Sequence, residues 1–320
     1  MTKTNQQKVK DFLINNGVII VMFILVIYTG FTSDNFFTKN NFMNILMNMS
    51  SRLVIALGIA GCVITAGCDL SAGRMIGFGA CISGMLLQRM DYSGKFFPDM
   101  QPLNVFVVAL IAMLGFAAFG TGTGFFIAYL NVPPFIATLA MMEIVYGIGL
   151  IVTNATPLGG YVEQYTNVSN GKFLGINYLI WIAIIVAAIT WFIFNMTRHG
   201  KYMYAIGGNP QAAEVAGVPV KATLILIYMK AAAMYGLAGF MLGAKAGGAS
   251  VQTGYGYEME AIAACTIGGV SVTGGRGKVS SAIIGVAVFE LLKVALQYLG
   301  MNANAQYIAI GVVIFIAISL

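Results

Sequence analysis

The stretch LILIYMKAAAMYGLAGFMLG, residues 224–243, decides the fold class of this chain. Lys230 is its only charged residue, and about 20 apolar residues are what an α-helix needs to cross a bilayer. A transmembrane β-barrel would show segments of about ten residues in which polar and apolar side chains alternate. Because the run is continuous, the sequence predicts membrane-spanning helices.

The whole chain has the same character. Hydrophobic residues make up 59% of its 320 positions and charged residues 9%, whereas soluble domains devote roughly a quarter of their residues to charge. With a mean hydropathy of +0.85, too few polar side chains remain to cover a surface that faces water. We therefore expect an all-α, polytopic integral membrane helix bundle, one domain over residues 1–320, with lipid around it.

About ten apolar segments are candidate membrane helices. They cover residues 12–31, 53–66, 70–87, 105–130, 135–152, 178–195, 222–243, 261–272, 279–299 and 305–320. All seven prolines fall between them, where a missing amide hydrogen breaks no helical bond. Most of the 39 glycines lie inside them, where they let helices approach closely in lipid. The sequence thus predicts about ten tightly packed helices.

Basic residues set the expected orientation. Lys3, Lys8 and Lys10 precede the first segment and no small-residue cleavage site follows it, so we expect a retained span. Ten crossings then put the basic stretches 197–221 and 273–278 on the same side as the N-terminus, as the positive-inside rule requires. The opposite side receives Asp34, Asp91, Asp99, Glu163, Glu258 and Glu260. The expected location is a bacterial inner membrane, with the N-terminus in the cytoplasm.

Several functional classes find no support in the residues. The cysteines lie in or beside apolar segments without zinc or redox spacing, and His199 is the only histidine, so no metal site or nucleophilic triad can be assembled. The net charge of +6 is spread over separate loops, which gives no reason to expect nucleic acid. An enzyme is therefore not expected.

The chain also lacks an ATP site. The nearest stretch to a phosphate-binding loop is GGRGKVSS, residues 274–281. Val279 follows Lys278 where the motif needs Ser or Thr, and Val272 stands where its first glycine belongs. We expect no cofactor on this chain, and ATP only on a partner subunit.

The stretch 197–221 is expected to be a cytoplasmic loop that carries one short helix. Asn209 suits an N-cap, Pro210 the first helical position and Gly217 the left-handed position after the helix. Between them lie the helix-compatible Gln211, Ala212, Ala213, Glu214 and Ala216. Two turns are marginal in water, so the helix must pack against something. Docking on a cytoplasmic ATPase is the preferred interpretation, and an ordinary interfacial loop is the alternative.

A discontinuous helix is predicted near residues 67–74. The segment 53–66 is short and runs into AGCDLSAGR, in which glycines, Asp69 and Ser71 would weaken a helix that faces lipid. Broken helices offer polar groups to a solute, so Asp69, Ser71 and Arg74 are candidate pathway residues. Equally open is a tight turn between two spans in which Asp69 and Arg74 neutralise each other.

Four charges lie inside apolar runs: Glu143, Lys230, Glu290 and Lys293. Each costs about 2.5–3.5 kcal/mol there on insertion scales and should face the bundle interior, a cavity or a partner. Glu290 and Lys293 are three residues apart and are expected to pair. Glu143 and Lys230 are expected to approach each other or to line the pathway.

Three tyrosines near the polar breaks are further pathway candidates: Tyr146, Tyr255 and Tyr257. Aromatic faces can stack on a sugar, although they also pack cores and interfaces. The main alternative from another class is a secondary transporter or channel that needs no ATPase, with Glu143, Lys230 or Asp69 as its coupling-ion site.

Five motifs carry a resemblance to a known family. They are ALGIAGCVITAGCDLSAGRMIGFGA (56–80), AYLNVPPFIATLA (128–140), YAIGGNPQAAEVAGV (204–218), YEMEAIAACTIGGVSVTGGRGKV (257–279) and AQYIAIGVVIFIAISL (305–320). Over nearly its whole length the chain resembles the permease subunits of bacterial ABC importers for monosaccharides, with Arg74 favouring the galactose and methyl-galactoside branch over the ribose one.

The resemblance implies a homodimer of permeases, each docked on a cytoplasmic ATPase and receiving sugar from a periplasmic binding protein. It also implies that residues 209–217 form the family's coupling segment. Glu143, Lys230 and Glu260 depart from the residues expected in the family, so related substrates such as nucleosides stay open. The chain stops at Leu320 inside an apolar run without a basic tail, which suggests a trimmed terminus.

Overall fold

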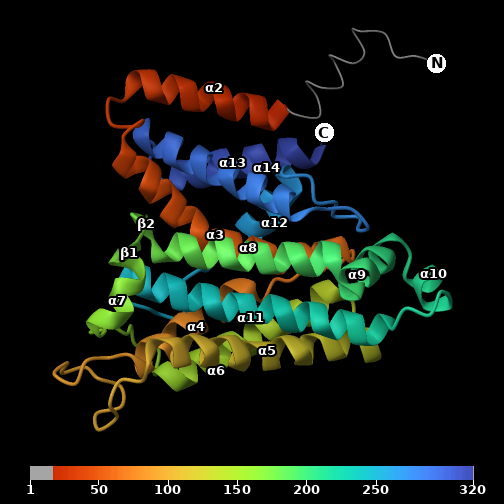
Figure 1. Cartoon of the computed structure of the whole chain (residues 1–320), viewed down its shortest axis with the longest axis horizontal. Helices are drawn as coiled ribbons and strands as arrows, with labels where there is room; N and C mark the ends of the chain where they lie inside the picture. Colours follow the sequence, from red (N-terminus) through yellow and green to blue (C-terminus); the bar gives the residue numbers. More distant parts are fainter. Residues whose placement is uncertain (1–16, 320) are drawn as a thin grey trace.

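The computed structural model describes residues 17–319, most of which are helical (Figure 1). The helices are α2 (Gly17–Thr32), α3 (Lys39–Ile64), α4 (Ala72–Leu86), α5 (Val105–Tyr129), α6 (Pro134–Thr153), α7 (Glu163–Asn170), α8 (Tyr178–Met196), α9 (Arg198–Gly208), α10 (Pro210–Val215), α11 (Val220–Ala246), α12 (Tyr257–Ile267), α13 (Val279–Tyr298) and α14 (Ala303–Ser319). A two-residue hairpin, β1 (Lys172–Phe173) and β2 (Ile176–Asn177), precedes α8. Lys3, Lys8, Lys10 and Leu320 lie outside the described residues.

Each of the ten predicted segments corresponds to a helix, which confirms the all-α membrane bundle. Among the described residues, α3, α5, α6, α8, α11 and α13 are long and apolar enough to cross a membrane. Helices α2, α4 and α14 are apolar but shorter, and α12 has only 11 residues. The count of about ten therefore holds for apolar helices, while six of them are full-length spans by themselves.

Helix α3 shows why one boundary was wrong. It begins at Lys39, not at residue 53, and Thr38 caps it by accepting a hydrogen bond from the Asn41 amide. Its first half is rich in asparagine and Arg52 follows, so the sequence predicts a loop there. Asn40 and Asn44 are exposed, whereas residues 53–64 are all buried by neighbouring helices.

Helix α11 is the centre of the bundle and packs against α3, α4 and α5. Glycines set the spacing of its contact with α5. A Cβ at Gly120 would lie 2.3 Å from the Tyr228 carbonyl oxygen, and one at Gly236 would lie 2.4 Å from the Ala112 carbonyl oxygen. The two backbones thus approach as closely as small residues allow, the usual device for packing helices in lipid.

Two helices start partway through the bundle. Residues 65–71 are irregular before α4, which confirms the predicted break. A second break, residues 247–256 before α12, was not predicted. At 1.5 Å per residue, α4 and α12 are roughly 22 Å and 16 Å long, less than the hydrocarbon thickness of about 30 Å.

The region 197–221 holds two helices, not a loop with one. Helix α9 begins after Thr197, whose hydroxyl accepts a hydrogen bond from the Gly200 amide, and α10 follows directly. Helix α9 was not predicted, because its sequence contains no long apolar run. Both helices lie at one end of the bundle in Figure 1, and the β1–β2 hairpin lies at the other.

Candidate functional site

The two broken helices meet inside the bundle. A Cβ added at Gly73 would lie 2.0 Å from Glu258 Oε2, and one at Gly77 would lie 2.6 Å from the Val251 carbonyl oxygen. The irregular residues 251–254 therefore run along the first turns of α4, and the start of α12 reaches the start of α4. Both helix N-termini, with their positive dipole ends, lie in one region.

Arg74, in the first turn of α4, is the centre of a polar and aromatic cluster in this region. Its guanidinium carbon lies 3.8 Å from the ring centroid of Tyr146 and 4.5 Å from that of Tyr255. Arg74 Nη1 donates to Gln252 Oε1 at 2.8 Å, and Gln252 Nε2 donates to the Tyr146 hydroxyl at 2.9 Å. The structure thus brings together three predicted candidates from α4, α6 and the second break.

The cluster retains unused hydrogen-bonding capacity. Arg74 Nε and Glu258 Oε2 are both buried and without a hydrogen-bond partner among the described residues. Tyr255 has 62% of its surface exposed. Such a site can stack a flat apolar face on tyrosine and offer both donors and acceptors to hydroxyl groups. Gln252 and Glu258 were missed as site residues because they belong to the unpredicted break and the helix that follows it.

Asp69 and Ser71 form a separate turn. Asp69 Oδ1 accepts hydrogen bonds from the Ser71 amide at 3.0 Å and from the Ser71 hydroxyl at 2.5 Å. Ser71 occupies the N-cap of α4 but makes no side-chain capping bond. Asp69 is 2% exposed and forms no ion pair with Arg74, so the predicted neutralisation of these two residues is wrong in the part of the chain described.

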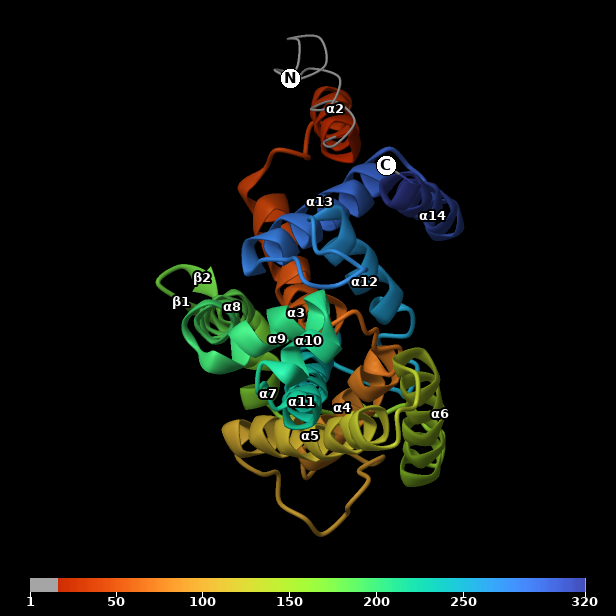
Figure 2. The same ribbon diagram turned by 90° about the vertical axis from the view of Figure 1, so that its right-hand side faces the viewer.

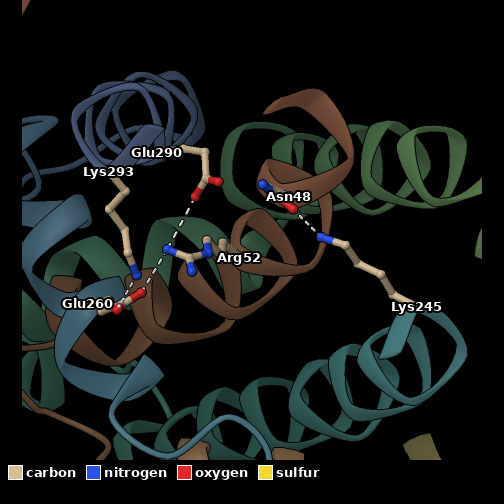
Figure 3. A network of polar contacts seen from close by, with 6 residues as sticks. All are labelled: Asn48, Arg52, Lys245, Glu260, Glu290 and Lys293. Atoms are coloured by element: carbon tan, nitrogen blue, oxygen red, sulfur yellow. Dashed lines mark hydrogen bonds and ion pairs between the residues drawn. The ribbon is translucent and has the colours of Figure 1, made fainter. Parts of the chain in front are cut away.

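A buried network of charges holds the start of α12 (Figure 3). Arg52 Nη1 lies 2.8 Å from Glu260 Oε2 and 3.2 Å from Glu290 Oε2, and Lys293 Nζ lies 2.7 Å from Glu260 Oε1. The expected pairing of Glu290 with Lys293 is therefore wrong. Each pairs with a residue of another helix: Glu290 with Arg52 of α3, and Lys293 with Glu260 of α12.

The network connects three helices at one point. Arg52 comes from α3, Glu260 from the first turn of α12, and the other two charges from α13. The negative charge of Glu260 is stabilising at the N-terminus of α12, where the helix dipole is positive. The guanidinium carbon of Arg52 also lies 5.0 Å from the Tyr257 ring centroid. Tyr257 therefore belongs to this network rather than to the Arg74 cluster. Beside it, Lys245 donates to Asn48 Oδ1 (Figure 3).

Glu143 and Lys230 do not approach each other. Glu143 is exposed on α6, whereas Lys230 lies on α11 in a crevice beside His199 of α9. Among the described residues no ion pair joins them, so the pairing hypothesis is wrong. The three residues proposed for a coupling-ion site, Glu143, Lys230 and Asp69, thus lie in three different environments.

The short helix α10 forms as predicted. Asn209 Oδ1 accepts a hydrogen bond from the Ala212 amide at 2.9 Å, Pro210 occupies the first turn, and Gly217 has φ +81°. Of its residues only Ala213 is buried, and Val215 is 91% exposed. Since α10 lies at the extreme end of the bundle in Figure 1, it presents nearly all of its surface outward.

Comparison with protein families matches residues 41–318 to the permease component of branched-chain amino acid transport systems. The chain belongs to this permease family. The galactose/methyl galactoside import permease protein MglC of Escherichia coli (strain K12) is 39% identical to it over 327 residues, covering the whole chain and 97% of that protein. The protein of the same name from Haemophilus influenzae is 40% identical, again covering the whole chain and 97% of that protein.

More distant relatives of the permease carry a different substrate in their names. The ribose import permease protein RbsC of Escherichia coli (strain K12) is 32% identical, covering 97% of the chain and 94% of that protein. No solved structure matches. The five motifs therefore identified the family correctly, and the permease is a multi-pass membrane protein.

Proposed function

We propose that this permease is the membrane subunit of an ABC importer that moves a monosaccharide of the galactose or methyl galactoside type into the cytoplasm. The observation that carries the proposal is similarity over the whole length: 39–40% identity to galactose/methyl galactoside import permeases, against 32% to a ribose import permease. Its partners would be a cytoplasmic ATPase, a periplasmic sugar-binding protein and a second copy of itself.

The proposed orientation places the N-terminus and the end that holds α9 and α10 in the cytoplasm of a bacterial inner membrane. Helix α10 is the proposed coupling helix, comprising Pro210–Val215 with the cap residues on either side. Its exposed surface and small side chains suit a groove on the ATPase, with Glu214 as its charged contact. A helix of six residues needs such a partner to be stable outside the bundle.

The Arg74 cluster is the proposed lining of the sugar pathway. Tyrosine rings suit the apolar faces of a pyranose, while Arg74 and Gln252 can donate to its hydroxyl groups. Tyr255 is largely exposed in the single chain, so a second copy placed against this face would enclose the cluster between two subunits.

A reconstitution experiment tests the proposal. The chain is incorporated into vesicles with and without its ATPase and sugar-binding protein, and the uptake of galactose, ribose and a nucleoside is measured. ATP-dependent uptake of galactose only in the complete system is expected. Uptake by the chain alone would refute the proposal in favour of a secondary transporter, and uptake of only the nucleoside would refute the sugar assignment.

A further inference from the structure

Lys230 lies in a crevice between α8, α9 and α11, with two glycines of α3 as its floor. The crevice is narrow, and its walls include Thr190, Phe194, Met203 and Met234. Figure 2 shows α8 and α6 on opposite sides of the bundle. The crevice therefore opens on a different face from the Arg74 cluster, which includes a residue of α6.

This crevice carries an unneutralised positive charge. Lys230 is half-buried and has no hydrogen bond or ion pair within residues 17–319. No acidic side chain lines the crevice. His199, outside the spans, is the other titratable residue that lines the crevice, and burial followed by the charge of Lys230 lowers its pKa from 6.5 to about 4. At neutral pH the lysine is thus the only charge in the crevice.

Lys230 lies nearer the α9 end of α11 than the middle of that helix. It is ten residues from the start of α11, roughly 15 Å along the helix, and a lysine stem can carry its ammonium group several ångströms toward the interface. The interface in question is the one near His199, because α9 lies at the end proposed to face the cytoplasm. Outside the crevice, Ile189 and Phe192 of α8 are more than half exposed, as expected of residues that contact lipid.

We propose that this crevice binds one anionic phospholipid of the inner leaflet, with its phosphate on Lys230 Nζ and its acyl chains on the apolar surface beside the crevice. Charge complementarity selects this occupant, since a buried lysine needs an anion and the surrounding wall is apolar. Arg198 and Lys201, both exposed on α9, add positive charge at the mouth. The inference uses the proposed orientation only to name the leaflet.

Native mass spectrometry of the full-length permease tests the inference. The protein is equilibrated in detergent with equal amounts of dioleoyl phosphatidylglycerol and dioleoyl phosphatidylcholine, and the retained lipid is counted. Wild type should retain phosphatidylglycerol preferentially, and Lys230→Gln should reduce this retention at least five-fold. The matched control is Lys221→Gln, a change of an exposed lysine on the same helix, which should leave it unchanged.

A charge-conserving variant separates recognition from folding. Lys230→Arg should retain most of the phosphatidylglycerol, because a guanidinium also binds phosphate. Equal loss in Lys230→Arg and Lys230→Gln would overturn the inference, as would equal retention in Lys230→Gln and Lys221→Gln. Equal retention of the two lipids by wild type would also overturn it, since the crevice would then hold lipid without regard to charge. None of these outcomes depends on transport activity.

Discussion

Replacing Arg52 by glutamine removes one of the two cations that balance Glu260 and Glu290. The side chains of Arg52, Glu260 and Lys293 are 15–19% exposed and that of Glu290 is 4% exposed. Removing one partner of a buried ion pair leaves an uncompensated charge and costs about 3–5 kcal/mol. With roughly 2–4 °C per kcal/mol for larger domains, the midpoint of thermal unfolding should fall by on the order of 10 °C.

The assay is thermal unfolding of the purified permease in detergent, followed by intrinsic fluorescence. Arg89→Gln is the matched control. Arg89 and Asp91 form an ion pair at 3.6 Å, but their side chains are 53% and 76% exposed, so the pair is worth about 0–1 kcal/mol. The control should therefore shift the midpoint by no more than a few degrees.

A double variant tests the charge balance itself. Arg52→Gln with Glu290→Gln removes one charge of each sign and leaves Lys293 paired with Glu260 at 2.7 Å. The double variant should be more stable than Arg52→Gln alone, with a coupling of about 0.5–3 kcal/mol. Additive losses, or a loss in Arg52→Gln no larger than in Arg89→Gln, would refute the idea that the four charges form one balanced network.

Three further variants examine other parts of the molecule. Gly73→Ala should destabilise the permease by about 1–3 kcal/mol through the clash with the facing carboxylate, whereas Gly115→Ala, with open space around it, should not; unfolding midpoints decide this. Glu214→Lys should uncouple ATP hydrolysis from sugar uptake in the reconstituted importer at unchanged thermal stability, and normal uptake would exclude a coupling role. Because the native pKa of His199 is about 4 rather than 6.5, the unfolded chain binds more protons between these values, so stability should fall as the pH is lowered from 6.5 to 4. His199→Asn should flatten this part of the stability curve, and an unchanged slope would argue against the assignment.

The sequence predicted those elements whose signals are local. Helix α10 was predicted because Asn209, Pro210 and Gly217 act within two turns of one another. The first break was predicted because AGCDLSAGR interrupts an apolar run. The family followed from motifs spread along the chain, and it required no spatial information.

The missed features depend on contacts between distant segments. Arg52 and Glu260 lie at the edges of apolar runs, so they were assigned to loops, yet they are 208 residues apart in sequence and form a hydrogen bond at 2.8 Å. Glu290 and Lys293 satisfied a local pairing rule, but two charges from other helices competed for them. The second break fell between two predicted segments and was assigned to a loop, because its position along α4 depends on contacts that the sequence does not show.

The last residue of α3 meets main-chain atoms of α9 and of the loop before α13. The Gly275 amide donates to the Ile64 carbonyl oxygen at 2.8 Å, and a Cβ at Gly207 would lie 1.8 Å from that same oxygen. Main-chain atoms have no rotamers with which to absorb a displacement. A push of a few ångströms on α9 must therefore either separate this junction or carry Ile64 with it. Ile64 is the residue from which the chain enters the break before α4, the helix whose first turn holds Arg74.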